Sequence, residues 1–478
     1  MIPVDGVVPV PICGEPVTTG ETIEVRAPYD GTVLGRAPAC GPEHVDRAVA
    51  AGRAALEADD LPTWRRAEIL DEAARLLAER HDTFARTIAL ESAKPIRTAR
   101  GEADRAVSTF QFAAAAARTL VGEMVPLDAS APGEGRIGFT LRVPIGVIGA
   151  ISPFNFPLNL VAHKLAPAIA AGCPVVLKPA SQTPFSAIAL ARLLLEECGL
   201  PPAWLHVVTG GGSTVGNALV EHEGVAMVSF TGSAEVGWSI RARAPRKKVG
   251  LELGNNAPVI IEADGDWKMA ADKIQVAGYA HAGQSCISTQ RVYVQRSIAA
   301  DFQAALAERV GGLVVGDPLD EATDVSALIS PEDRERVRSW VGDAVAGGAR
   351  LLAGGQPEGR AAMEPTLLAE VTADMAVSRE EVFGPVVGVA AYDTLDEALA
   401  LANDTAFGLQ AAVFTADLHR ALHAARHLDY GGVLVNEVPT WRADQMPYGG
   451  VRDSGNTREG PAYSVREMTE SRLVVINP

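Results

Sequence analysis

Cysteine is scarce in this sequence. Five cysteines occur among 478 residues, they are widely spaced, and none belongs to a CxxC pair or lies near a histidine cluster. An odd number of isolated cysteines argues against both a disulfide framework and a zinc site. We therefore expect a protein of the reducing cytoplasm that binds no metal.

Long apolar runs and clusters of positive charge are lacking as well. The longest apolar stretch, Leu165 to Leu177, is interrupted by prolines and is too short to span a bilayer, and the N-terminus has no signal-peptide pattern. The net charge is −17, from 42 basic and 59 acidic residues. We therefore expect neither a membrane nor nucleic acid as a partner, although one or two arginines can still hold a small anionic ligand.

The sequence does contain alternating helical and strand patterns, over a length that suggests two or three domains. Residues 41–118 carry apolar side chains at helical spacing. Residues 119–142 contain glycine, proline and short alternating runs, which indicate extended strands that project from the main body. From residue 145 to about residue 249, buried-type strands alternate with helices in the rhythm of a parallel, doubly wound sheet.

Two glycine-rich turns in this region suit a dinucleotide. The turn from Gly210 to Gly216 offers backbone N–H groups to a phosphate, but Asn217 stands where an ATP-binding loop has lysine, and the spacing misses GxGxxG. The segment Thr231-Gly232-Ser233 opens the next helix in a similar way. On spacing alone, ordinary glycine-rich turns remain the alternative.

A second α/β unit begins near residue 250, with a helix expected over 266–282 and a last strand at 433–436. A turn-rich segment follows it. The tail ends in an apolar strand at 473–476 that has no obvious partner in the sequence. We expect that this strand could pair with the 119–142 ribbon of a neighbouring subunit.

One cysteine, Cys286, stands out by its setting. It follows the helical run, in the segment from His281 to Arg291, among small and polar residues that leave the thiol close to backbone N–H groups. A thiolate in such a setting can attack a carbon electrophile, whereas a lone cysteine is more often a buried structural residue. The segment alone leaves both interpretations open.

Six motifs, one of which contains Cys286 itself, favour the nucleophile. They follow one another in the order and spacing of the aldehyde dehydrogenase superfamily, which the chain resembles over nearly its whole length. The motifs are Pro153-Phe154-Asn155-Phe156-Pro157, Lys178-Pro179-Ala180-Ser181, Phe230-Thr231-Gly232-Ser233, Leu251-Glu252-Leu253-Gly254, Gly283-Gln284-Ser285-Cys286 and Glu381-Val382-Phe383-Gly384-Pro385.

The resemblance implies an α/β fold of the aldehyde dehydrogenase type. Such a fold has a Rossmann-type nucleotide-binding domain, an α/β catalytic domain and a small β oligomerisation element that builds a homodimer or homotetramer. The implied division is a nucleotide-binding domain of residues 1–118 and 143–249, a catalytic domain of residues 250–436, oligomerisation strands in 119–142 and 460–478, and a substrate-entrance loop of residues 437–459.

The resemblance also implies a mechanism. Cys286 would attack the aldehyde carbon to give a thiohemiacetal, whose oxyanion the Asn155 amide and the Cys286 backbone N–H would stabilise. Hydride transfer to nicotinamide would leave a thioester, and Glu252 would activate the water that hydrolyses it. Lys164 matches a lysine that the family keeps near the active asparagine. Taken alone, Asn155 could be a turn former and Glu252 a surface charge.

Contacts with a nicotinamide dinucleotide follow from the same resemblance. Lys178 resembles the ligand of the ribose hydroxyls, Ser233 resembles a pyrophosphate contact, and Glu381 and Phe383 resemble the residues that hold the nicotinamide ribose and ring. The other expected cofactor contacts are Ser152, Pro153, Phe154, Gly211, Gly216, Phe230, Gly232, Val236 and Leu253.

The expected cofactor preference depends on Ser181. Many NAD-preferring relatives carry a glutamate at this position, where the carboxylate repels the 2′-phosphate of NADP. Serine removes that repulsion and can donate to a phosphate, so we expect NADP to be accepted as well as NAD.

The substrate tunnel is expected to be polar. His163 replaces a tryptophan common in enzymes of fatty and aromatic aldehydes and, with Asn159, favours short hydrophilic aldehydes. Arg442 lies in a segment similar to the branch with lactaldehyde, phosphonoacetaldehyde and non-phosphorylating glyceraldehyde-3-phosphate dehydrogenases, and could clamp a carboxylate or phosphate. A solvated loop arginine is the alternative. Ser285 and Ile287 flank the nucleophile as candidate pocket contacts.

The expected activity is therefore NAD(P)-dependent oxidation of a short polar or anionic aldehyde to its acid. A CoA-acylating dehydrogenase is an alternative, although Glu252 favours hydrolysis. A catalytically silent relative with a binding or structural role is disfavoured by the intact Cys286, Glu252 and Asn155. A cysteine esterase would leave the dinucleotide-binding pattern unexplained.

Overall fold

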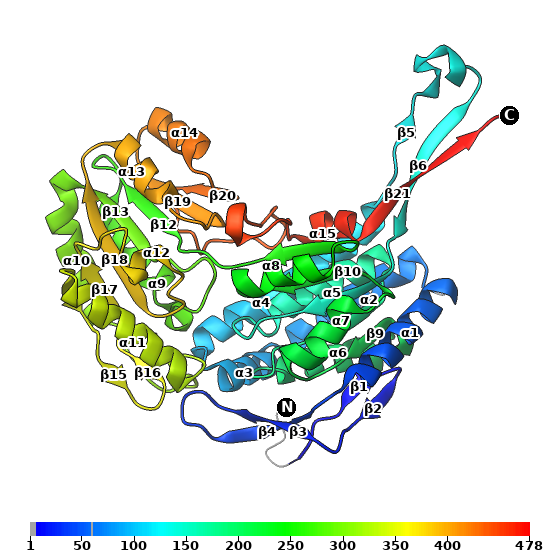
Figure 1. Cartoon of the computed structure of the whole chain (residues 1–478), viewed down its shortest axis with the longest axis horizontal. Coiled ribbons are helices and arrows are strands. Elements are labelled where there is room, and N and C mark those ends of the chain that lie inside the picture. The colour runs from blue at the N-terminus through cyan, green and yellow to red at the C-terminus, as the bar shows by residue number, and fades with distance from the viewer. Residues whose placement is uncertain (1–5, 59–60) are drawn as a thin grey trace.

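The computed structural model describes residues 6–58 and 61–478, which form two α/β units side by side and a narrow ribbon that projects from the body (Figure 1). One unit is built around a five-stranded sheet and the other around a seven-stranded sheet. The two units confirm the α/β fold class expected from the alternation of strands and helices.

The five-stranded sheet has the order β11-β10-β7-β8-β9, and every neighbouring pair is parallel. All residues of β7 and β8 are buried, as expected for a parallel sheet with helices packed on it. The strands are β7 (Val147–Ile151), β8 (Val175–Lys178), β9 (Leu205–Val207), β10 (Val225–Thr231) and β11 (Lys248–Glu252).

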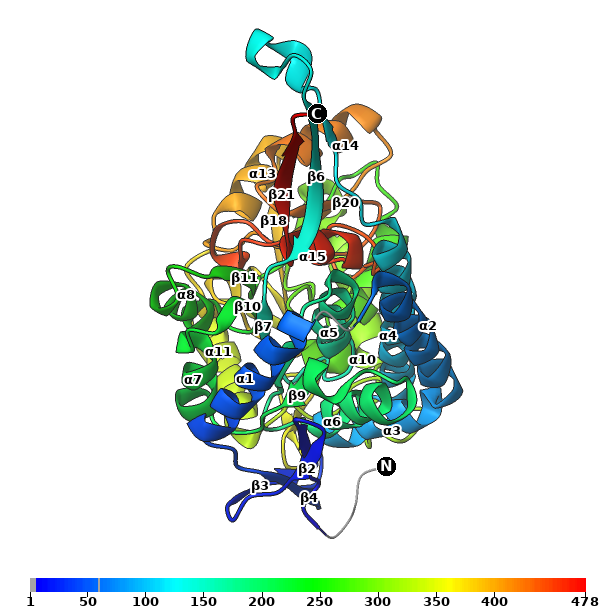
Figure 2. The ribbon, with the colours of Figure 1, turned by 90° about the vertical axis from the view of Figure 1, so that its right-hand side faces the viewer.

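Helices from the first half of the chain surround this sheet (Figure 2). Among them, α2 packs against α4, and α4 packs against α5. The helices are α1 (Pro42–Ala58), α2 (Thr63–Glu79), α3 (His81–Ser92), α4 (Ile96–Thr119), α5 (Asn159–Ala171), α6 (Phe185–Arg192), α7 (Asn217–Glu221) and α8 (Ala234–Arg243).

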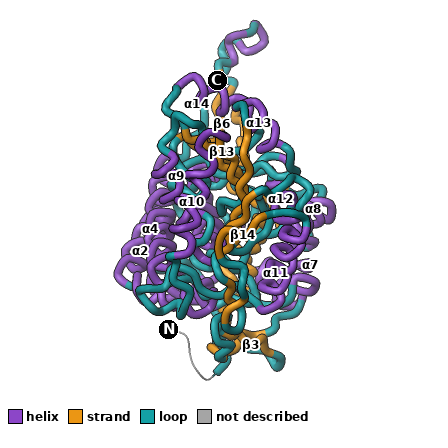
Figure 3. The backbone as a smooth tube through the Cα atoms, turned by 90° about the vertical axis from the view of Figure 1, so that its left-hand side faces the viewer, coloured by secondary structure: helices purple, strands orange, loops and turns teal. Residues whose placement is uncertain are grey.

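The seven-stranded sheet has the order β14-β17-β18-β13-β12-β19-β20, in which only β14 runs antiparallel to its neighbour. Figure 3 shows its strands between α9 and α10 on one side and α11 and α12 on the other. The strands are β12 (Pro258–Ile261), β13 (Arg291–Gln295), β14 (Arg350–Ala353), β17 (Thr366–Ala369), β18 (Val386–Tyr392), β19 (Gln410–Phe414) and β20 (Gly432–Val435). The helices are α9 (Trp267–Ala277), α10 (Ala299–Gly311), α11 (Pro331–Ala346), α12 (Ala376–Arg379), α13 (Leu395–Asn403) and α14 (Leu418–His427).

The projecting ribbon is a three-stranded antiparallel sheet of β21, β6 and β5 (Figures 1 and 2). Here β5 is Met124–Val125, β6 is Ile137–Pro144 and β21 is Thr469–Ile476. The tail strand therefore pairs with β6 of its own chain, and the expected pairing with a neighbouring subunit's ribbon is wrong. The segment before it forms helix α15 (Pro461–Glu467), which packs on α4 and α5.

Two predicted boundaries need correction. β11 runs from Lys248 to Glu252 and pairs with β10, so the first sheet continues past the expected division at residue 250. The helix expected over 266–282 ends at Ala277. A 3₁₀ turn follows, in which His281 and Ala282 have φ angles of 50° and 53°. Left-handed residues cannot continue an α-helix, and the chain turns there before it reaches Cys286.

Smaller elements complete the described part of the chain. They are the pairs β1 (Val10–Ile12) with β2 (Glu15–Val17), β3 (Thr22–Arg26) with β4 (Val33–Pro38), and β15 (Pro357–Glu358) with β16 (Ala362–Met363). Among the described residues, no helix is long and apolar enough to cross a bilayer, and no cluster of metal-ligating side chains is found.

Candidate active site

The site lies where the strands of the first sheet end. Parallel strands direct their carboxyl ends to one edge, so residues that terminate different strands come together there. Lys178 ends β8 and pairs in register with Ile151, the last residue of β7. Thr231 ends β10 and pairs in register with Glu252, the last residue of β11.

A cavity of about 640 Å³ opens at this edge and contains both the nucleophile and most of the expected cofactor contacts. Gly211 and Gly216 are absent from its lining, and Gly212 is present instead. Helix geometry begins at Gly212, which places that residue rather than its neighbours against the cavity. The expected cofactor residues in the lining are Ser152, Pro153, Phe154, Lys178, Ser181, Phe230, Gly232, Ser233, Val236, Leu253, Glu381 and Phe383.

Polar groups in the lining have unused hydrogen-bonding capacity, which fits a dinucleotide. The buried Lys178 ammonium donates only to the Pro179 carbonyl, at 3.4 Å, among the described residues. The Ser152 hydroxyl is buried and has no partner among them. Ser233 precedes α8 and makes no side-chain cap, which leaves N–H groups at that helix start available to an anion. Phosphate and ribose oxygens can bond to such groups.

Two residues of the second unit close the cavity near the nucleophile. The Glu381 carboxylate accepts a hydrogen bond from the Asn255 N–H at 3.0 Å, and burial raises the pKa of Glu381 to about 7. The rings of Phe383 and Phe154 meet edge to face at 5.7 Å. Arg336 of α11 also lines the cavity, although it belongs to none of the motifs described above.

Cys286 lies in a loop shaped by tight backbone contacts. Gly283 has a φ of 71°, and a Cβ atom there would lie 2.0 Å from the Gly384 carbonyl oxygen, so only glycine fits. Burial raises the pKa of the Cys286 thiol to about 12, and a hydrogen bond with Tyr448 opposes that rise. The Cys286 sulfur lies 3.1 Å from the Tyr448 hydroxyl. Tyr448 was not a predicted site residue, because it lies far along the chain in a turn-rich segment.

Asn155 is tied to the same loop. Its side-chain amide donates to the Gln284 carbonyl at 2.9 Å, and its Oδ1 atom is buried without a partner among the described residues. The amide nitrogen carries a second hydrogen, which can serve an oxyanion. The structure therefore brings the predicted amide donor and the predicted nucleophile together.

Glu252 is buried, and neither of its carboxylate oxygens has a hydrogen-bond partner among the described residues. Burial, followed by the charge of Glu459, raises the pKa of Glu252 well above its ordinary value. Lys164 donates to Thr231 at 2.7 Å and to Ser229 at 3.2 Å, and its ammonium lies 3.9 Å from Glu459. The alternative that Glu252 is a surface charge is wrong.

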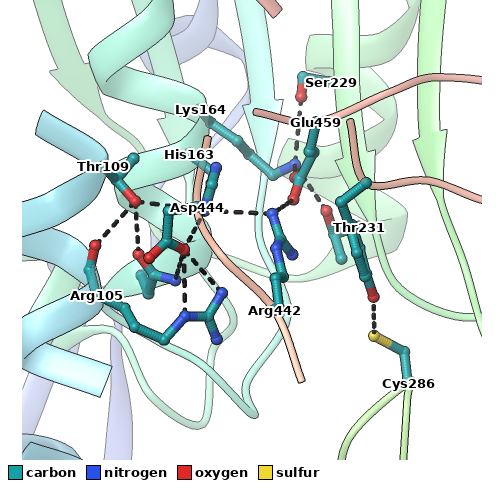
Figure 4. Close-up of polar contacts among 12 residues, drawn as sticks. Arg105, Thr109, His163, Lys164, Ser229, Thr231, Cys286, Arg442, Asp444 and Glu459 are labelled. Carbon is teal, nitrogen blue, oxygen red and sulfur yellow. Dashed lines mark hydrogen bonds and ion pairs between the residues drawn. The ribbon is translucent and has the colours of Figure 1, made fainter. Parts of the chain in front are cut away.

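Arg442 is also buried, so it is not a solvated loop arginine. Its Nη2 atom donates to Glu459 at 3.0 Å and to His163 at 3.2 Å, and the guanidinium lies 3.7 Å from the centre of the Tyr448 ring. Figure 4 shows Lys164 and Arg442 converging on Glu459. The Arg442 Nε atom has no acceptor among the described residues.

His163 belongs to a second polar cluster beside Arg442 (Figure 4). Its Nε2 atom lies 3.1 Å from Asp444 and 3.3 Å from the Thr109 hydroxyl. Burial lowers the pKa of His163. Asp444 also accepts a hydrogen bond from Arg105 at 2.8 Å. The side chains around His163 are polar, and a polar substrate tunnel at this place stays a prediction.

The two residues that flank Cys286 play smaller parts in the geometry. The Ser285 hydroxyl accepts a weak hydrogen bond from the Ile287 N–H at 3.4 Å. Ile287 packs with Leu409 and Tyr448 in a small apolar cluster against Cys286. A direct role for Ser285 and Ile287 toward a substrate stays a prediction.

Sequence similarity to known proteins extends over almost the whole chain. The 3-sulfolactaldehyde dehydrogenases of Priestia aryabhattai and Priestia megaterium are each 46% identical over 464 residues, which cover 97% of this chain and 97% of theirs. A lactaldehyde dehydrogenase of Methanococcus aeolicus is 38% identical and covers 95% of this chain and 97% of its own.

Solved structures of other aldehyde dehydrogenases also superimpose on this chain. Aldehyde dehydrogenase 21 of Physcomitrella patens, in complex with the reaction product succinate, superimposes with a TM-score of 0.95 at 37% identity, over 99% of both chains. The glyceraldehyde-3-phosphate dehydrogenase GapN of Methanocaldococcus jannaschii, complexed with NADP, has a TM-score of 0.92 at 37% identity, over 96% of this chain and 100% of its own. Residues 16–474 match the aldehyde dehydrogenase family. The chain belongs to this family and is an NAD(P)-dependent aldehyde dehydrogenase.

Proposed function

We propose that this enzyme oxidises a short aldehyde with an anionic or strongly polar group at its far end to the carboxylic acid. The observation that carries the proposal is Arg442, a buried arginine stacked on the tyrosine that contacts Cys286, with one N–H left without an acceptor among the described residues. A buried donor without a partner costs free energy, which an anionic substrate group can recover. The relatives named for sulfolactaldehyde, lactaldehyde and glyceraldehyde-3-phosphate support a small polar substrate.

In the first step, Cys286 is the nucleophile and Asn155 is a hydrogen-bond donor to the oxyanion. The Cys286 thiolate forms a bond to the aldehyde carbon, and the carbonyl electron pair moves onto the oxygen. The free Asn155 amide hydrogen and the Cys286 backbone N–H then donate to that oxyanion, which typically contributes a few kcal/mol to such a step. When bound, the nicotinamide dinucleotide supplies the hydride acceptor for the oxidation.

In the second step, Glu252 is the base that takes a proton from water. The thioester carbon is attacked by water, Glu252 takes a proton from that water, and the Cys286 thiolate leaves with the electron pair of the carbon–sulfur bond. A carboxylate whose pKa is raised by burial is a stronger base than an exposed one. Hydrolysis by Glu252 favours a free acid as product over the CoA-acylating alternative, which dependence of turnover on CoA would reveal.

We also propose that the enzyme uses NADP at least as well as NAD. Ser181 lines the cavity, and its hydroxyl donates to the Gly210 carbonyl at 3.0 Å. No carboxylate stands at this position to repel a 2′-phosphate.

The assembly that we propose is a homodimer or homotetramer in the cytoplasm. β21 is the outer strand of the ribbon and leaves one edge unpaired, with Leu473 and Val475 exposed to 55% and 48%. An apolar edge strand of this kind is a pairing surface for another chain. All five cysteines are free, which supports a reducing compartment.

The test is the formation of reduced nicotinamide with five aldehydes, each with NADP and with NAD. The aldehydes are 3-sulfolactaldehyde, glyceraldehyde-3-phosphate, succinic semialdehyde, lactaldehyde and hexanal. We expect the anionic substrates to exceed hexanal in kcat/KM. We expect Arg442→Gln to lower kcat/KM for anionic substrates by about 10- to 100-fold more than for lactaldehyde, since only the anionic substrates lose a hydrogen bond between charged groups.

Arg442→Lys is the matched control, because it keeps the charge beside Glu459. It should retain more activity on the anionic aldehydes than Arg442→Gln does. The proposal would be contradicted if hexanal were the best substrate. It would also be contradicted if Arg442→Gln lowered kcat/KM equally for anionic and neutral aldehydes. Loss of turnover in Cys286→Ala would show that the measured activity comes from this site.

A further inference from the structure

We propose that Tyr448 is a catalytic residue, whose hydroxyl donates a hydrogen bond to the Cys286 thiolate and holds the sulfur in place for attack. The role belongs to the aldehyde dehydrogenase reaction itself and does not depend on which aldehyde is the substrate. It goes beyond the nucleophile, amide and carboxylate assigned above.

The geometry of the contact carries the inference. The Tyr448 hydroxyl lies 3.1 Å from the Cys286 sulfur and has no other hydrogen-bond partner among the described residues. In a neutral thiol, either atom can be the donor. Once the thiol loses its proton, only the hydroxyl can donate, so the O–H must point to the sulfur. The bond becomes charge-assisted and therefore favours the thiolate over the thiol.

The Tyr448 side chain is fixed before the reaction begins. Its backbone pairs with Glu459 through hydrogen bonds of 3.0 and 2.6 Å, in an isolated antiparallel bridge. The Arg442 guanidinium lies 3.7 Å from the ring centre, and Ile287 and Leu409 pack around the buried ring. A donor held in this way needs no reorganisation when charge appears on the sulfur.

A buried nucleophile needs such a donor. Burial raises the pKa of the Cys286 thiol, and the hydrogen bond with Tyr448 is the largest influence that lowers it. Burial also raises the pKa of Tyr448 well above its ordinary value, so the phenol keeps the proton that it donates. The positive charge of Arg442 lowers the pKa of both groups.

The same bond acts twice in one turnover. When the sulfur attacks, its negative charge moves through the new carbon–sulfur bond to the aldehyde oxygen, and the Tyr448 bond weakens. When water later attacks the thioester, the carbon–sulfur bond breaks, the electron pair returns to sulfur, and Tyr448 again donates to the thiolate. Tyr448 therefore assists both the entry of the nucleophile and its departure.

The experiment is alkylation of Cys286 by iodoacetamide as a function of pH, in the full chain without aldehyde or nucleotide. The modified peptide is quantified by mass spectrometry for the wild type and for Tyr448→Phe. Loss of a hydrogen bond to a charged group should move the midpoint of the profile up by about 1 to 2 pH units. At neutral pH, alkylation should then slow by about tenfold or more, and it should recover toward the wild-type rate at high pH.

Tyr279→Phe is the matched control. Tyr279 is also buried, and its hydroxyl also makes one hydrogen bond, to the Thr366 carbonyl at 3.0 Å. This variant should keep the wild-type midpoint even where it lowers thermal stability. A Tyr448→Phe profile that superimposes on the wild type, or an equal shift in Tyr279→Phe, would overturn the inference. Because alkylation involves no aldehyde, such a failure is distinct from a failure of the proposed substrate class.

Discussion

Glu252 ends β11, and both of its carboxylate oxygens are buried without a partner among the described residues. This arrangement costs folding free energy, and it leaves the carboxylate free to act on water in the reaction. Because the acid is harder to ionise in this setting, the base form appears only as pH rises through the raised pKa. We therefore expect the hydrolysis step to accelerate with pH above the range of an ordinary carboxyl. The positive charges of Arg442 and Lys164 oppose the rise.

Glu252→Gln should separate the two steps of the reaction. The amide cannot accept the proton of water, so hydrolysis should slow by about 10²- to 10⁴-fold while attack by Cys286 continues. A burst of reduced nicotinamide should precede slow turnover, and intact-mass analysis should detect an acyl group on Cys286. Steady turnover without a burst, and without an acylated protein, would assign the base to another group.

Ser181 allows a test of cofactor preference at a single position. Ser181→Glu places a carboxylate in the cavity, where it repels the 2′-phosphate of NADP. We expect kcat/KM with NADP to fall by about tenfold or more, with a much smaller change for NAD. Ser181→Ala is the control, since it removes the hydroxyl without adding charge and should leave the NADP-to-NAD ratio closer to the wild type. Equal effects of Ser181→Glu on both cofactors would show that the preference is set elsewhere.

At the scale of the elements, strands could be predicted better than loops. Lys178 ends the buried strand β8, whose apolar pattern predicts that its carboxyl end meets those of the other parallel strands at one edge. Strand β11, which Glu252 ends, was not among the expected strands. Tyr448 and the burial of Arg442 could not be predicted in this way, because both lie in a turn-rich segment without periodicity. The left-handed His281 was missed for a different reason, since its segment keeps a helical pattern although tertiary packing turns the chain.

A buried ion pair supports the turn that carries Asn155. Lys94 bonds to one oxygen of Glu102, and the other oxygen accepts the N–H groups of Leu158 and Asn159 at 2.9 and 3.1 Å, where α5 begins. The Lys94 ammonium also lies 3.7 Å from the centre of the Phe156 ring, next to Asn155. The pair therefore connects the start of α4 with both the Asn155 turn and α5.

Lys94→Met should lower the free energy of unfolding by about 3–5 kcal/mol, because it leaves the Glu102 carboxylate buried without its counter-ion. The double variant Lys94→Met/Glu102→Gln should lose less than the single variant, since no uncompensated charge remains. Urea denaturation of the three proteins measures the differences. Arg338→Met breaks an exposed pair with Glu335 and serves as the control, for which no measurable change is expected. A double variant less stable than Lys94→Met would contradict the argument.

At the scale of the whole molecule, the chain ends in the ribbon and not in either α/β unit. α15 packs on α4 and α5, and it delivers Thr469 opposite Pro144, so the register along β6 follows from the last turn of that helix. An alternating apolar strand shows which faces its side chains occupy but not which strand it joins, and for this reason the sequence did not identify β6 of the same chain as its partner. The intrachain pairing leaves the outer edge of β21 without a neighbouring strand among the described residues.

The double variant Leu473→Glu/Val475→Glu tests whether that edge builds the assembly. These side chains share one face of β21, and two carboxylates brought into an apolar contact between copies would be desolvated without partners. We expect light scattering on a sizing column to show the wild type as a multiple of the 50.0 kDa chain and the variant at or near 50.0 kDa. Val345→Glu, on an exposed site of α11, is the control and should keep the wild-type mass. If the variant keeps the wild-type mass, the contact between copies lies on another surface. If the variant is a 50.0 kDa monomer whose Cys286 is still alkylated, the site folds within one chain.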